Sequence, residues 1–86
     1  MRDRTSPRFW SLYNRLPVDI QRLADRRFDL LKADRRHPSL HYKRVGPFWS
    51  ARVNKDYRCL AADKGDDVYW FWIGPHDEYL RLIGRL

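Results

Sequence analysis

The stretch FWSARVNKDYRCLAA, residues 48–62, contains two apolar-rich segments of strand length on either side of a polar turn. That turn, Asn54-Lys55-Asp56, has the composition of a hairpin loop. A second polar turn at 63–67 leads into another apolar run at 68–73. The sequence therefore predicts a three-stranded antiparallel meander with strands at about 48–53, 57–62 and 68–73.

The register of the first predicted hairpin brings two arginines together. If Val53 pairs with Tyr57 across the loop, Arg52 lies directly opposite Arg58. Like charges at directly opposed positions destabilise a sheet. An anion between the two guanidiniums would remove that repulsion, and arginine is suited to hold phosphate through two hydrogen bonds. We therefore expect an anion site here; the alternative is that each arginine pairs with a separate carboxylate at positions 77–78.

The second hairpin predicts which side chains share the arginine face. Pairing Ala62 with Val68 places Trp70 and Trp72 on that face, together with Ser50 and Leu60. We expect both indoles to be core residues rather than stacking platforms for bases, because aromatic side chains are usually buried. The opposite face, which we expect to lie against helices, carries Trp49, Ala51, Val53, Tyr57, Cys59, Ala61, Tyr69, Phe71 and Ile73.

Helices are predicted before and after the meander. Ser6-Pro7 is typical of a helix start, and an apolar stripe at helical spacing runs from Phe9 to Leu16. Pro17 opens a second helix whose stripe runs from Ile20 to Leu31. After Gly74-Pro75 a last stripe comprises Tyr79, Leu82, Ile83 and Leu86. Short extended segments are also compatible with residues 1–5 and 40–45.

These elements predict the fold class. We expect an α+β fold in which a helical hairpin packs on a small antiparallel sheet, with a C-terminal helix after it. The length of 86 residues fits one domain over 1–86. A hydrophobic fraction of 43% excludes a disordered chain.

The positive charge is concentrated in one part of the chain. The formal net charge is +7, and residues 35–58 contain seven basic side chains against one acid. Such a block attracts polyanions. The charge alone leaves three interpretations open: a nucleic-acid partner, an acidic protein partner, or a solvated surface.

Other protein classes are excluded by what the sequence lacks. A single cysteine, Cys59, allows neither an internal disulfide nor a four-cysteine zinc site. The longest apolar run, 68–73, is far too short to span a membrane, and no signal-peptide-like run follows Met1. We therefore expect a cytoplasmic protein without a membrane partner.

The histidines differ in what their positions indicate. His37 and His41 are four residues apart with Pro38 between them, which does not suit a metal site, and we expect no metal and no other cofactor. His76 lies at the turn into the last helix, at the edge of the arginine face, and its titration range suits proton transfer. Tyr79 follows on the same helix side, where it can pack or donate a hydrogen bond. The alternative for His76 is a simple helix cap.

Three segments resemble the RelE/ParE-like toxins. They are HPSLHYK at 37–43, WSARV at 49–53 with Tyr57-Arg58, and WFWIG at 70–74 with His76 and Tyr79. The resemblance extends over about residues 9–83. It implies a short strand, two helices, an antiparallel strand set and a terminal helix.

The resemblance also implies a function. Relatives of the RelE type are toxins of bacterial toxin–antitoxin pairs that cut messenger RNA in the ribosomal A site without metal, by attack of the ribose 2′-OH on the adjacent phosphate. By position, the expected catalytic residues are Arg58, Arg52, His76 and Tyr79. The basic residues expected to contact RNA backbone are Arg35, Arg36, Lys43, Arg44, Lys55 and Arg81. The expected partners are messenger RNA, the ribosome and a cognate antitoxin in a hetero-oligomer.

The chain also departs from the RelE pattern. Ser50 stands where a second strand lysine is expected, and His76-Asp77 replaces a Lys/Arg pair. The identities of base and acid therefore stay open. So does a ParE-like alternative, in which the toxin inhibits DNA gyrase and cleaves no RNA, and so does a nucleic-acid-binding module without toxicity.

Overall fold

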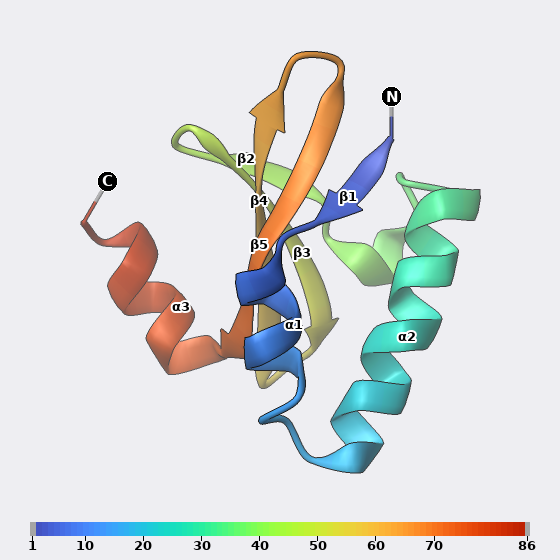
Figure 1. Ribbon diagram of the computed structural model, residues 1–86, viewed down its shortest axis with the longest axis vertical. Coiled ribbons are helices and arrows are strands. Elements are labelled where there is room, and N and C mark those ends of the chain that lie inside the picture. The colour runs from blue at the N-terminus through green and yellow to red at the C-terminus, as the bar shows by residue number, and fades with distance from the viewer. Residues whose placement is uncertain (1, 86) are drawn as a thin grey trace.

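The computed structural model describes residues 2–85 as a five-stranded sheet with helices on both faces (Figure 1). The strands are β1 (Asp3–Thr5), β2 (Lys43–Val45), β3 (Phe48–Asn54), β4 (Tyr57–Lys64) and β5 (Asp67–Pro75). The helices are α1 (Pro7–Tyr13), α2 (Val18–Ala33), the 3₁₀ turn η1 (Pro38–Leu40) and α3 (His76–Ile83). The predicted α+β class is confirmed.

The predicted meander forms the centre of the sheet. The strand order is β1-β5-β4-β3-β2, and every pairing is antiparallel except that of β1 with β5. The predicted short first strand is present as β1, and the extended segment before residue 46 is shortened to β2 because residues 38–40 form η1. Met1, like Leu86 of the predicted last stripe, lies outside the described residues. Among residues 2–85, none of the helices is long and apolar enough to cross a bilayer.

Helices α1 and α2 begin where the sequence predicts. The Ser6 hydroxyl accepts a hydrogen bond from the Phe9 N–H at 3.2 Å, which caps α1. This helix ends at Tyr13, three residues before the predicted stripe does, but Leu16 is still buried. The Gln21 amide donates to two backbone carbonyls of the turn between the helices, at 3.1 and 3.2 Å, and so fixes that turn.

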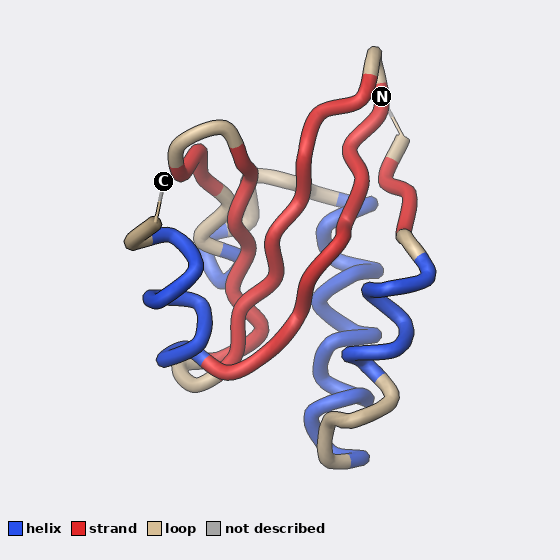
Figure 2. The backbone as a smooth tube through the Cα atoms, turned by 60° about the vertical axis from the view of Figure 1, so that its left-hand side comes forward, coloured by secondary structure: helices blue, strands red, loops and turns tan. Residues whose placement is uncertain are grey.

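The sheet separates two apolar clusters. Figure 2 shows the helices on the two sides of the sheet. Helices α1 and α2 cover one face, where the larger cluster is built around Leu31, Leu40, Val53, Trp70 and Ile73. Helix α3 covers the other face, where the smaller cluster contains Leu60, Trp72 and Tyr79. We call these the α1/α2 face and the α3 face.

The predicted register of the second hairpin is wrong. Ala62 pairs with Tyr69 rather than Val68, and an irregularity between Leu60 and Ala61 shifts the pairing further along the strand. Trp70 therefore pairs with Ala61, whereas Trp72 pairs with Leu60. Because consecutive residues of β4 point to opposite faces, the two indoles lie on opposite faces of the sheet. Both are buried, as expected of core residues.

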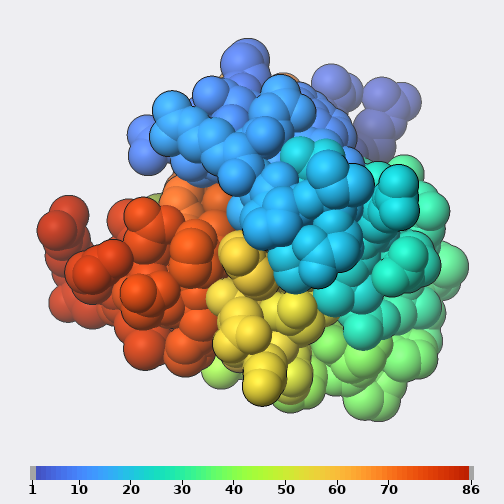
Figure 3. Space-filling view, turned by 90° about the horizontal axis from the view of Figure 1, so that it is seen from below, coloured from blue at the N-terminus to red at the C-terminus, as the bar shows by residue number. Residues whose placement is uncertain are grey.

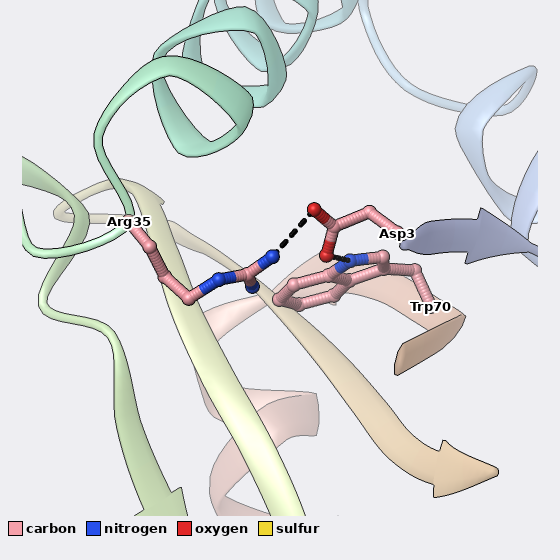
Figure 4. A network of polar contacts seen from close by, with 3 residues as sticks. All are labelled: Asp3, Arg35 and Trp70. Atoms are coloured by element: carbon pink, nitrogen blue, oxygen red, sulfur yellow. Dashed lines mark hydrogen bonds and ion pairs between the residues drawn. The ribbon is translucent and has the colours of Figure 1, made fainter. Parts of the chain in front are cut away.

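Trp70 belongs to a polar network that holds the edge strand β1 (Figure 4). Its indole N–H donates to Asp3 Oδ1 at 3.0 Å, and Arg35 Nη2 donates to Asp3 Oδ2 at 2.6 Å. The Asp3 side chain is only 4% exposed. The Arg35 guanidinium also lies 5.0 Å from the centre of the Tyr42 ring. The network thus joins β1 to β5 and to the end of α2.

A candidate phosphate-binding cleft

The two arginines lie opposite each other on neighbouring strands, as predicted. Arg52 of β3 pairs with Arg58 of β4, and Ser50 pairs with Leu60. The expected pairing of Val53 with Tyr57 is wrong, because a bulge after Arg52 brings Asn54 opposite Tyr57. The Asn54 side chain accounts for this tighter turn: its Oδ1 accepts from the backbone N–H groups of Asp56, within the turn, and Tyr57, at the start of β4, at 2.8 and 3.0 Å.

The charge of this pair is not neutralised by a carboxylate in the described part of the chain. Among residues 2–85, neither Arg52 nor Arg58 takes part in an ion pair. Arg58 Nη1 instead donates to two backbone carbonyls, those of Asn54 and Tyr57. Burial lowers the pKa of Arg58, and the nearby charge of Arg52 lowers it further. The alternative of separate partners at positions 77–78 is therefore not found in the described part of the chain.

The arginine pair lines a cleft of about 250 Å³. Its lining residues come from the segment around β2, from the central strands β3 and β4, and from α3. They are His41, Lys43, Val45, Ser50, Arg52, Arg58, His76, Tyr79, Leu80 and Ile83. No carboxylate is among them, so the described lining is positively charged and suits an anion.

His76 lies in this cleft because of how α3 begins. It is the first residue of that helix, and its backbone N–H donates to the Asp56 carbonyl at 2.7 Å. This bond holds the start of α3 against the β3–β4 turn, and Figure 3 shows the turn in yellow next to the orange-red helix. The residue at the cap position is Pro75, and no side chain caps the helix. His76 therefore does not act as the helix cap.

Tyr79 both packs and forms a hydrogen bond. Its ring lies 5.9 Å from the His76 ring between centroids, with an interplanar angle of 27°. Its hydroxyl and the Ser50 hydroxyl are 2.8 Å apart, and the two residues are 4% and 2% exposed. Ser50 thus anchors Tyr79 to β3. Tyr79 in turn limits where the His76 ring can lie.

Two of the six predicted RNA-contacting residues are close to the cleft. Lys43 lines it, because the β2–β3 register places Lys43 opposite Ser50. Lys55 is exposed in the β3–β4 turn, adjacent to the Asp56 carbonyl that receives the His76 N–H. Both lysines can therefore approach a polyanion that occupies the cleft.

The other four predicted residues lie elsewhere. Arg35 is held by Asp3 in the network described above. Arg44 forms a 2.6 Å ion pair with Asp63 and stacks on Trp49, with its guanidinium 4.5 Å from the ring centre. Arg36 is exposed after the end of α2. Arg81 lines a separate groove between α1 and α3, which it shares with Arg8 and Arg85.

His41, whose spacing from His37 bears only on metal binding, also lines the cleft. It follows η1 with a left-handed backbone, φ 44° and ψ 42°. His37 is oriented differently, since its Nδ1 lies 2.8 Å from the Ser39 hydroxyl and caps η1. Within residues 2–85 no three His, Cys, Asp or Glu side chains gather in a way that could hold a metal ion. The left-handed backbone that turns His41 towards the cleft cannot be predicted from the spacing of side chains.

Comparison with solved structures identifies the fold. The chain is similar to a YoeB/ParE toxin from Agrobacterium tumefaciens, with a TM-score of 0.66 and 13% sequence identity over 88% of this chain and 99% of that one. The chain has a RelE/ParE-like toxin fold. A copper-bound point mutant of a toxin from Helicobacter pylori is similar as well, with a TM-score of 0.62 and 16% identity over 91% of this chain and 97% of that one.

No protein-family model matches the sequence, and no curated protein is detectably similar to it. The fold implied by the short motifs is therefore confirmed by structure rather than by sequence identity. Within this RelE/ParE-like fold, the paired arginines lie on the two central strands β3 and β4, and His76 lies where β5 passes into α3.

Proposed function

We propose that this chain is the toxin of a bacterial toxin–antitoxin pair and that it cleaves messenger RNA in the ribosomal A site. The RelE/ParE-like fold, shared with two solved toxins, supports the toxin role. One observation carries the nuclease assignment: Arg52 and Arg58 lie side by side in a cleft whose described lining contains no carboxylate. A phosphodiester is the natural ligand for such a pair.

The arginine pair would bind the scissile phosphate and stabilise its transition state. Negative charge accumulates on the phosphoryl oxygens when the 2′-oxygen attacks, and fixed donors aimed at those oxygens favour this state over the ground state. Arg58 is partly buried and held by two backbone carbonyls, so its guanidinium is already in place before RNA binds. This preorganisation makes Arg58 the main charge-stabilising residue and Arg52 its partner.

The remaining need is proton transfer. The 2′-oxygen loses a proton and bonds to phosphorus, the bond from phosphorus to the 5′-oxygen breaks, and that oxygen gains a proton. The products are a 2′,3′-cyclic phosphate and a 5′-hydroxyl. His76, which lines the cleft, would exchange a proton with one of these oxygens, and Tyr79 would act as a positioning residue that holds the imidazole. In this scheme the guanidiniums supply the positive charge, and no metal ion or cofactor takes part.

Backbone contacts outside the cleft would supply affinity without sequence preference. Lys43 and Lys55 lie next to the cleft, and Arg36 is exposed farther along the chain. Contacts of this kind neutralise phosphates and release counterions, so binding to ribosomal RNA would weaken as salt increases. Arg35 and Arg44 already have carboxylate partners and would contribute less.

A cognate antitoxin would form a hetero-oligomer with the chain in the cytoplasm. An acidic segment laid over the cleft would mask Arg52 and Arg58 through charge and bulk together. Such a complex would block access of RNA to the arginine pair.

Controlled expression in bacteria tests the proposal. Rapid loss of messenger RNA with cuts inside translated codons is the expected result. DNA damage with intact messages would instead establish the ParE-like alternative, inhibition of gyrase. Unimpaired growth would leave only a non-toxic nucleic-acid-binding module.

Matched variants assign the effect to the cleft. Arg58→Gln and His76→Asn should abolish growth arrest while the protein still folds. Arg22→Gln removes an exposed arginine of α2 that does not line the cleft, and this variant should arrest growth like the unmodified chain. Full arrest by both cleft variants would remove these residues from the chemistry.

A further inference from the structure

We propose that His41 is a second catalytic residue of the cleft and that His41 and His76 divide the two proton transfers of RNA cleavage between them. This inference rests on the proposed nuclease function. It identifies the second proton-transfer group, which a mechanism with His76 alone lacks. A single histidine serves one oxygen at a time. In cleavage, one oxygen must lose a proton while another gains one.

The topology places the two histidines on different sides of the arginine pair. His41 immediately precedes the segment that leads into β2, which lies on the β3 edge of the sheet. His76 begins α3, which packs against β4 and β5. The pair Arg52 and Arg58 occupies β3 and β4, between those two sides. A phosphate held by the guanidiniums would therefore have one imidazole on each side.

This arrangement matches the geometry of the reaction. Displacement at phosphorus is in line, so the attacking 2′-oxygen and the leaving 5′-oxygen lie on opposite sides of the phosphorus atom. One neutral imidazole accepts the 2′-hydroxyl proton as the new P–O bond forms. The other, protonated, imidazole donates its proton to the 5′-oxygen as the old P–O bond breaks. Atoms and charge balance without any further reactant.

The backbone of His41 is unusual in a way that points to a role for its side chain. With φ at 44°, it is the one non-glycine residue between 2 and 85 that has a positive φ. This conformation is unfavourable for residues with a Cβ, and glycine or asparagine usually occupies it. Such strain is found preferentially at functional sites. Here it turns the chain after η1, so that the imidazole reaches the cleft.

The imidazole of His41 is also free to act. Within residues 2–85 its ring makes no hydrogen bond, whereas the His37 ring is engaged by Ser39. The charged and titratable groups that share its cleft are Lys43 from β2, Arg52 from β3, Arg58 from β4, and His76 and Tyr79 from α3. None of them is a carboxylate that would hold the ring in a fixed ion pair.

Cleavage on programmed ribosomes, measured across pH, tests the assignment. His41→Asn is the informative variant, because asparagine tolerates the left-handed backbone but cannot transfer a proton. The unmodified chain should give a bell-shaped pH profile, and His41→Asn and His76→Asn should each lower the rate by about 10²-fold or more. Each variant should also lose one limb of the pH profile: one variant should lose the acidic limb and the other the basic limb. His37→Asn is the matched control and should keep the rate and both limbs.

A substrate with sulfur in place of the 5′-oxygen at the cut site identifies the acid. A thiolate leaves without being protonated, so this substrate should restore the rate of whichever histidine variant lacks the acid, and leave the other variant slow. A purely structural defect would not be restored. Thermal unfolding of His41→Asn confirms that it is folded, and His41→Gly, which also accepts the left-handed backbone, provides a second variant.

Two results would overturn the inference while leaving the nuclease function intact. In one, His41→Asn stays within about threefold of the unmodified rate. In the other, the rate falls but both limbs persist and the sulfur substrate restores neither histidine variant. An unmodified chain that cleaves no message is a different result, which refutes the proposed function itself and this inference with it.

Discussion

The two faces of the sheet treat their polar groups in opposite ways. On the α1/α2 face, Asp3 is buried and accepts hydrogen bonds from both Arg35 and Trp70. On the α3 face, Arg52 and Arg58 lie side by side, and neither has a carboxylate partner among residues 2–85. Folding pairs the charge of Arg35 with that of Asp3 on the first face, and on the second it gives the two arginine charges no such partner in the part of the chain that the structure describes. The α3 face, with these two arginines, is therefore where an anionic ligand can gain the most binding energy.

The two faces also differ in how fully their apolar side chains are buried. Burial on the α1/α2 face raises the pKa of the Cys59 thiol to about 12, which keeps it protonated and unreactive at neutral pH. On the α3 face the cleft stays open, and Leu80 on its rim is 50% exposed. The α1/α2 face therefore provides stability, and the α3 face provides the site.

Trp70→Ala should have the largest effect on stability. It empties a fully buried position on the α1/α2 face and removes one donor to Asp3. We expect a loss of about 3–5 kcal/mol in the free energy of unfolding, measured in urea. Trp10→Ala removes an indole that is 44% exposed and should cost less than half as much. Equal losses would mean that the buried position of Trp70 contributes no more to stability than an exposed position on α1.

Arg58→Gln should have the largest effect on activity with little effect on stability. Losing a preorganised donor at the phosphate should slow cleavage by about 10²–10³-fold. The free energy of unfolding should change by less than about 1 kcal/mol, because the loss of the bonds to backbone carbonyls is offset by relief of repulsion from Arg52. Urea unfolding and ribosomal cleavage measure the two quantities. A variant that is unstable but fully active would reverse the roles assigned to the two faces.

Tyr79→Phe tests how α3 is attached to the sheet. Removing the phenol leaves the buried Ser50 hydroxyl without its partner and should cost about 1–3 kcal/mol. The double variant Ser50→Ala/Tyr79→Phe should cost less than the sum of the two single variants, because the hydrogen bond is lost only once. Additive losses in a double-mutant cycle would show that this hydrogen bond does not fix α3.

Sulfate should stabilise the unmodified chain by a small amount. Bound between the guanidiniums, an anion at ten times its dissociation constant adds about 1.4 kcal/mol to the free energy of unfolding. Arg52→Gln should lose most of this gain, whereas chloride at equal ionic strength should not reproduce it. The same shift in the variant and the unmodified chain would place the anion elsewhere.

Much of the fold could be predicted from local signals. Turn composition and alternation indicated the meander, and the Ser6-Pro7 start and Pro17 located α1 and α2. The pairing of Arg52 with Arg58 was also predicted correctly, although the turn is one residue shorter than assumed. A bulge in β3 compensates for the shorter turn and restores this pairing. Counting alternation cannot detect such irregularities. For the same reason, alternation predicted Trp70 and Trp72 on one face of the sheet, whereas the register shift between Leu60 and Ala61 places them on opposite faces.

The rest of the site depends on contacts between distant residues. Asp3 and Arg35 are 32 positions apart, and nothing local indicates that the arginine is held in the core network. His41 reaches the cleft through a left-handed turn, and a histidine is not the residue that predicts one. The sequence therefore indicated which residue types form the site, but only the fold shows which of them are available to a ligand.

The most direct test of the central claim is the chemistry of the cut end on ribosomes programmed with a defined message. If Arg52 and Arg58 hold a scissile phosphodiester, the upstream fragment should end in a 2′,3′-cyclic phosphate. A single 2′-deoxy substitution at the cut site should then abolish cleavage, and Arg58→Gln should slow it by about 10²–10³-fold. Intact messages in the presence of active, growth-arresting protein would contradict the account.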